Sequence, residues 1–225
     1  MATGGHTAIR MGQQRMNSDV LTLSQLLSPS FPVGAFAYSH GLETAIDDGL
    51  ITDATSLRDW VSDLMEHGSL RNDAVLLNLA YADTDSKRVD AVARAFAASR
   101  ERLVEADLQG AAFCDTVRDV CGLELGRICY PVAVGCTARM LTLDPELTAA
   151  MYAQAFVANM AAAAMRLVPL GQTDGQLVQT ALKPMCLSLA AETQGASEDD
   201  LSSFAFLSDI VAMRHEVQSP RIFRT

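Results

Sequence analysis

The sequence has little positive charge and few aromatic residues. Of its 17 basic residues only Lys87 and Lys183 are lysines, against 27 acidic residues, and the formal net charge is −10. Because sequence-independent binding to nucleic acid or to an anionic membrane needs clustered positive charge, neither activity is expected. Aromatic residues make up 6%. Runs of β-branched residues are rare and Asn-Gly turns are absent, which argues against a β-sheet protein.

Cysteine motifs and nucleotide-binding motifs are missing as well. The five cysteines contain no pair with CxxC spacing, so we interpret them as small core residues of a cytoplasmic protein. No segment has the Gly-Lys-Ser/Thr ending of a P-loop, so the chain itself should not hydrolyse a nucleotide. Residues 1–16 lack the apolar stretch of a signal peptide and are predicted to form a flexible polar tail.

Helical periodicity is what the sequence does have, along nearly its whole length. Asp144-Pro145-Glu146 is a strong helix start, with a cap, a proline in the first turn and an acid near the positive end of the helix dipole. Ser197 with Asp200 should open the last helix, and Pro184 should kink or divide the helix around it. We predict one all-α domain over residues 17–218, a single bundle of about ten helices, followed by a separate tail at 219–225.

One uncharged stretch requires a membrane test. Leu147–Met165 spans 19 residues without a charge, but it contains Thr148, Gln154 and Asn159 and is otherwise rich in alanine. Alanine contributes little to membrane insertion, and it lets neighbouring helices approach closely. A buried core helix is therefore expected here, and not a membrane span.

The segment around His40 carries several possible chemistries. Residues 37–41 resemble a degenerate nucleophile elbow, but the strand that such an elbow requires is missing. Pro32 and Gly34 should fix the preceding loop, with Gly34 at positive φ. His40 and Glu43 share one helix face and could form a hydrogen-bonded pair, a metal contact or a partner contact. An all-α metal-dependent enzyme that uses these two residues is the alternative hypothesis.

Three later segments offer further candidates. His215 and Glu216 lie near the end of the last helix, but as sequence neighbours they point to different faces and cannot chelate one ion together. Residues 171–176 resemble a loop before a helix, which could hold an anion on its backbone N–H groups or act as a rigid turn. Residues 219–225 alternate arginine with apolar bulk, as a frayed end or a docking peptide could.

Four segments follow a known pattern in order. The first, residues 30–43, reads Ser-Phe-Pro-Val-Gly-Ala-Phe-Ala-Tyr-Ser-His-Gly-Leu-Glu. The others are residues 130–135, residues 166–176, and residues 213–216 with the tail at 221–225. Together they resemble the family of the urease accessory protein UreF, whose pattern has serine, a bulky residue, Pro-x-Gly, an aromatic and then Ser-x-Gly-Leu-Glu. Small departures are Pro29 in place of an acid, and Ile222 and Thr225 in place of leucine and serine.

This resemblance implies a non-catalytic, all-α chaperone of nickel insertion into urease that forms a homodimer. Such proteins bind the accessory protein UreD, called UreH in some organisms, and recruit the GTPase UreG. The chain would bridge these two partners and influence GTP-dependent nickel delivery to the urease apoprotein. No tightly bound cofactor is expected, and nickel is expected only in transit. The implied partner-binding residues are Phe36, Tyr38, His40, Glu43, Gln172, Thr173, Gln176, His215, Glu216, Arg221, Ile222, Phe223 and Arg224.

Overall fold

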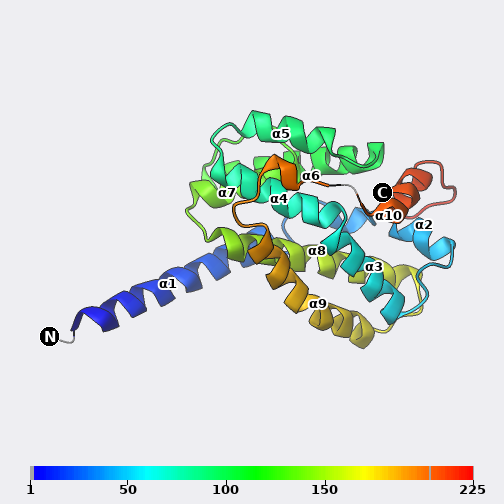
Figure 1. Cartoon of the computed structure of the whole chain (residues 1–225), viewed down its shortest axis with the longest axis horizontal. Coiled ribbons are helices and arrows are strands. Elements are labelled where there is room, and N and C mark those ends of the chain that lie inside the picture. Colours follow the sequence, from blue (N-terminus) through cyan, green and yellow to red (C-terminus); the bar gives the residue numbers. More distant parts are fainter. Residues whose placement is uncertain (1–2, 203, 225) are drawn as a thin grey trace.

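The computed structural model describes residues 3–202 and 204–224, with side chains from Gln14 onward, and within these ranges it contains helices and no strand (Figure 1). The prediction of a single all-α bundle of about ten helices is confirmed. The elements are α1 (Thr3–Leu26), η1 (Ala35–Ala37), α2 (Leu42–Asp47), α3 (Ala54–Glu66), α4 (Ser69–Ala82), α5 (Ser86–Ala95), α6 (Arg100–Cys121), α7 (Tyr130–Met140), α8 (Pro145–Leu167), α9 (Gln172–Glu192), η2 (Glu198–Asp200) and α10 (Phe206–His215).

Helix α8 lies at the centre of the bundle and packs against α9, α4 and α2 (Figure 1). Asp144 caps it as predicted, because its carboxylate accepts a hydrogen bond from the backbone N–H of Leu147. In the described part of the chain it is the one helix long and apolar enough to cross a membrane, but 61% of its apolar window is buried inside the fold. The expected core helix is therefore observed.

Close helix packing depends on a glycine in α7. A Cβ atom built on Gly135 would lie 2.2 Å from the carbonyl oxygen of Leu77 in α4. Any larger residue there would force α4 and α7 apart, and these two helices make one of the most extensive contacts in the bundle.

Two helix boundaries differ from the prediction. The Ser197–Asp200 capping box is present, but it closes the short 3₁₀ turn η2, and the last helix begins only at Phe206. The reason is tertiary: Ser202 exchanges two hydrogen bonds with Asn72 of α4, which holds the chain out of helical geometry. Helix α9 continues past Pro184, so the proline does not divide the helix, and a kink there stays a prediction. The proline is exposed, so the carbonyl group that loses its N–H partner can be hydrated.

The two ends of the chain behave differently. Helix α1 extends away from the bundle (Figure 1), and it includes residues 3–16, for which a polar tail and no helix was predicted. Only its last turns enter the core, through Leu23 and Leu26. The flexibility of residues 1–16 stays a prediction. The C-terminal residues, in contrast, turn back from α10 onto α2 and α6.

Candidate functional site

The segment of residues 30–43 forms a tight turn that directs polar side chains inward. Gly34 has φ 73°, as predicted, and Gly41 has φ 77° at the start of α2. A Cβ on Gly41 would lie 3.0 Å from the backbone nitrogen of Ala212, so α10 can pack directly against this turn. His40 has φ 54°, a conformation that costs a non-glycine residue about 1–3 kcal/mol. Interior contacts of its imidazole ring offset this cost.

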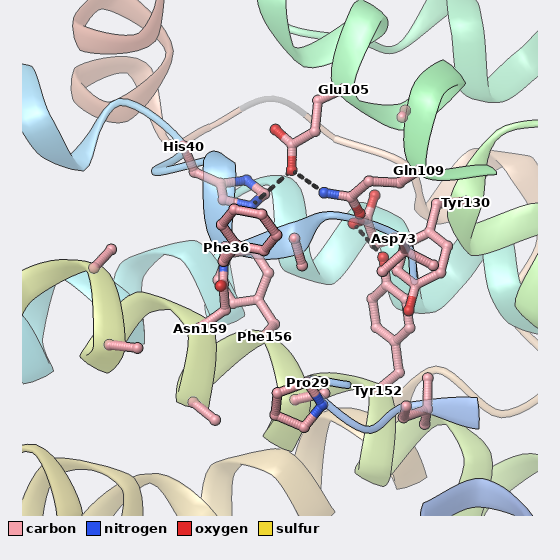
Figure 2. Close-up of a pocket in the computed structure, with 18 of the residues that line it drawn as sticks. Pro29, Phe36, His40, Asp73, Glu105, Gln109, Tyr130, Tyr152, Phe156 and Asn159 are labelled. Carbon is pink, nitrogen blue, oxygen red and sulfur yellow. Dashed lines mark hydrogen bonds and ion pairs between the residues drawn. The ribbon is translucent and has the colours of Figure 1, made fainter. Parts of the chain in front are cut away.

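The His40 ring is buried beside a carboxylate of α6. Its Nε2 lies 3.1 Å from Oε1 of Glu105 (Figure 2). The Arg102 guanidinium donates to Oε2 of the same carboxylate at 2.6 Å. Burial lowers the pKa of His40, and Arg102 lowers it further. Burial alone would raise the pKa of Glu105, but Arg102 and His40 together lower it to about 2. A neutral ring beside an ionised carboxylate carries its hydrogen on Nε2, so Nδ1 is left as an acceptor.

Asp73 of α4 completes this group, which we call the ionic cluster: His40, Asp73, Arg102 and Glu105. Asp73 accepts a hydrogen bond from the Tyr152 hydroxyl at 2.8 Å and lies 3.8 Å from the Arg102 guanidinium. Burial raises the pKa of Asp73, while Arg102 and Tyr152 oppose this shift. The cluster lies at the floor of a pocket of about 230 Å³ between α6, α8 and the segment that precedes α2 (Figure 2).

Glu43 holds the C-terminal segment from the other side of the same turn. Its two carboxylate oxygens accept hydrogen bonds from the backbone N–H groups of Ile222 at 2.6 Å and Phe223 at 2.8 Å. The fully buried His215 ring bridges two carboxylates, with Nε2 3.3 Å from Glu43 and Nδ1 2.7 Å from Glu101 of α6. We call this arrangement, with residues 221–224, the tail clasp.

Further contacts fix the end of the chain against the turn. Arg221 pairs with Glu101, and the backbone N–H of Arg224 donates to the carbonyl oxygen of Ala37 at 2.8 Å. Phe223 is 3% exposed and belongs to the hydrophobic core. Arg166 of α8 lies over the Phe223 ring, 5.8 Å from its centroid. The tail predicted at 219–225 is therefore not separate from the bundle, because Phe223 lies in the hydrophobic core and the carboxylates of Glu43 and Glu101 bind the segment.

The structure brings His40 and Glu43 close in space but does not make them one site. His40 binds Glu105, whereas Glu43 binds the tail and His215. No group of three or more His, Cys, Asp or Glu side chains that could hold a metal ion occurs among the described residues. The alternative hypothesis of a metal-dependent enzyme that uses His40 and Glu43 thus finds no support in the geometry.

The implied partner-binding residues fall into three groups by burial. Five cannot form a partner surface in this conformation, because they are buried by their own chain: Tyr38, His40, Glu43, His215 and Phe223. Glu216 is partly buried and accepts hydrogen bonds from the first backbone N–H groups of α6. The exposed members are Phe36, Gln172, Thr173, Gln176, Arg221, Ile222 and Arg224. For these, partner contact stays a prediction.

Sequence reasoning missed the acidic and basic partners on α4 and α6. Arg102, Glu105 and Gln109 lie at helical spacing in phase with the fully buried Phe113, so the polar residues continue the buried face of α6. A charged residue in phase with a core face was the signal that could have identified them.

Comparison with known proteins gives the family. Residues 51–183 match the family model described as UreF. The urease accessory protein UreF of Roseobacter denitrificans is 50% identical over 213 residues, which cover 93% of this chain and 96% of that protein. That of Ruegeria pomeroyi is 45% identical over 209 residues, covering 92% and 96%, and that of a Jannaschia species is 41% identical over both full lengths. The chain therefore belongs to the UreF family of urease accessory proteins, and it is an accessory protein and not an enzyme.

Proposed function

We propose that this chain joins UreD (UreH) to the GTPase UreG, and that the assembly delivers nickel to the urease apoprotein under the control of GTP. Family membership supports a role in urease activation. Because the chain lacks a P-loop, the nucleotide must be hydrolysed by another subunit. Nickel is the cargo of the assembly, and the chain acts in the cytoplasm as a homodimer.

The tail clasp is the observation that carries this proposal. By fixing the end of the chain, it holds Arg221, Ile222 and Arg224 in exposed positions, and the hydrogen bond from the Arg224 N–H to the Ala37 carbonyl oxygen brings the last of them beside the residue that follows Phe36. We call Phe36, Arg221, Ile222 and Arg224 the docking face. Ile222 is 73% exposed and Phe36 is 65% exposed, although both are large apolar side chains. Exposed apolar anchors next to arginines are typical of protein interfaces. The fixed conformation lowers the entropy lost when a partner binds.

Co-purification with UreD and UreG, with and without GTP, tests the proposal. Ile222→Asp should reduce recovery of a partner about tenfold or more, as loss of one buried apolar anchor predicts. The matched control is Leu187→Asp on α9, because Leu187 is similarly apolar and 64% exposed but lies outside the docking face. Equal recovery with both variants would contradict the docking face, and no recovery of either partner by the unaltered chain would contradict the bridging role.

A further inference from the structure

The last helix of the bundle, α10, carries apolar residues on both of its sides. Its inner side, which includes Val211 and His215, is buried, and the helix packs against α2 and α6 at one end of the bundle (Figure 1). On its other side the residues are large and apolar, yet more than half of each is exposed. We call these residues the outer face of α10: Phe204, Phe206, Leu207, Ile210, Met213 and Val217. Because a helix that is apolar all round is normally buried on all sides, we expect the outer face to be covered in the assembly in which the chain works.

Four residues of the outer face are spaced like the core positions of a coiled coil. They follow one another at intervals of four, three and four residues: Phe206, Ile210, Met213 and Val217. This is the spacing of the a and d positions of a heptad, and it places one apolar line along about three helical turns. The rings of Phe204 and Phe206 meet edge to face with their centroids 6.4 Å apart, which extends the line at its first end. Such a line fits the apolar side of one further helix.

The exposed apolar area of the outer face is large for a free protein. Added together, the exposed fractions of its six residues equal almost four whole side chains, or about 700 Å² at roughly 200 Å² for each. The largest apolar patch on a monomer is usually about 300–600 Å², whereas a stable protein interface buries about 800 Å² on each partner. The outer face therefore has nearly the area of a complete interface.

Charged residues lie beside the apolar line and not on it. The helical period places Asp209 on one flank of the line and Arg214 on the other. The Arg214 guanidinium donates to both carboxylate oxygens of Asp48, at 2.5 and 3.1 Å. An apolar centre with a polar rim is the usual composition of a protein interface. Because the line itself carries no charge, its recognition depends on apolar contact.

We propose that the outer face of α10 receives an amphipathic helix from a partner protein. Apolar side chains of that helix, spaced by three and four residues, pack between those of the line. A protein that bridges two partners needs contact with both, and the docking face exposes only two large apolar side chains, Phe36 and Ile222. That the helix belongs to UreD or UreG rests on the proposed function, whereas the apolar recognition of a helix does not.

Oxidation of Met213 by hydrogen peroxide measures whether the outer face is covered, and Met140 of α7 is the reference. Met213 is 52% exposed and Met140 is 45% exposed, so in the full-length free chain the two should be oxidised at rates within about twofold of each other. If Met213 were instead strongly protected in the free chain, a second copy of the chain would cover the outer face, and the proposal would be wrong.

Two helical peptides that differ only along one side test the recognition on the free chain. A peptide of about five helical turns with leucine at its a and d positions is used below the concentration at which it self-associates. It should slow the oxidation of Met213 about tenfold at saturation and leave that of Met140 unchanged. The same peptide with glutamine at those positions should bind about tenfold more weakly or less. Equal protection by the two peptides, or no protection by the leucine peptide, would overturn the proposal.

Variants of the chain locate the binding. Ile210→Asp should weaken the binding of the leucine peptide about tenfold or more, and Phe206→Ala about threefold. The matched control is Leu187→Asp on α9, because Leu187 is 64% exposed and lies outside the outer face. Phe206 is 64% exposed, so its variant decides the matter if Ile210→Asp does not fold. Unchanged affinity of the Phe206 variant, or of a folded Ile210 variant, would refute the assignment.

The source of the helix is tested on the preassembled complex with UreD and UreG. If a helix of a partner covers the outer face, Met213 should be oxidised about tenfold more slowly than in the free chain, and the leucine peptide should no longer bind. Undiminished oxidation of Met213 in the complex would refute a partner helix. Failure of the complex to assemble would count against the proposed function alone, because peptide binding is measured on the free chain.

Discussion

The tail clasp makes Phe223 the most informative residue to change. Burial of its side chain contributes about 1.5–3 kcal/mol, and each hydrogen bond donated to the Glu43 carboxylate contributes about 1.5–3 kcal/mol. Ordering residues 221–224 costs about 1–2 kcal/mol per residue, or about 4–8 kcal/mol in total. The stabilising contacts and the entropy cost of ordering nearly balance, so the closed clasp is more stable than the open one by only a few kcal/mol.

Phe223→Ala should therefore open the clasp. An interior Phe→Ala change usually costs about 3–5 kcal/mol, because a cavity remains. Here residues 221–224 can detach from the bundle instead of leaving a cavity. The free energy of unfolding can then decrease by no more than the free-energy difference between the closed and the open clasp, about 2 kcal/mol. The helical core should stay folded, and the backbone amides of residues 222 and 223 should lose their protection from hydrogen exchange.

Urea unfolding followed by circular dichroism gives the loss of stability, and hydrogen exchange gives the opening. Ile222→Ala is the matched control, because its neighbouring side chain is 73% exposed and should change stability by less than about 0.5 kcal/mol. If Phe223→Ala behaved like this control in both measurements, the clasp would not be closed in solution. A chain that failed to fold would show that the segment carries more of the core than the contacts indicate.

Three further predictions concern the bundle, the ionic cluster and the oligomer. Gly135→Ala should destabilise the fold by about 3 kcal/mol, because its Cβ would clash with Leu77; a thermal melt like that of the unaltered chain would contradict this packing. The free energy of unfolding should decrease in two steps as the pH falls. The first step begins below about 6.5, because the pKa of His40 is lowered in the folded state and the unfolded chain takes up the proton first. The second runs from about 4.5 towards 2, because the pKa of Glu105 is lowered to about 2 in the folded state. Glu105→Gln should make the second decrease smaller but not remove it, because the pKa values of Asp53, Asp83 and Asp200 are also lowered in the folded state, and acid titration of unfolding in both proteins checks this. Light scattering at tens of micromolar should give the mass of a dimer, and a monomer mass would refute the homodimer.

The sequence alone determined the helical architecture and the family. Helix caps, such as that of Asp144, and apolar periodicity act within a few residues, so α8 could be placed and judged buried from local pattern alone. The positive φ of Gly34 was equally accessible, because it follows from the steric freedom of one residue. The four motif segments led to the family without any knowledge of how they meet in space.

Only the tertiary structure decided what the polar motif residues bind. Glu43 meets the tail from 180 residues away in the sequence, and His215 meets Glu101 across 114 residues. The start of α10 was likewise set by Asn72, 130 residues before Ser202. Such contacts depend on the packing of whole helices, and no local pattern encodes which buried carboxylate a histidine will face. Five of the residues expected on the surface were therefore found inside, where charge pairing and hydrogen bonds hold the end of the chain against α2 and α6.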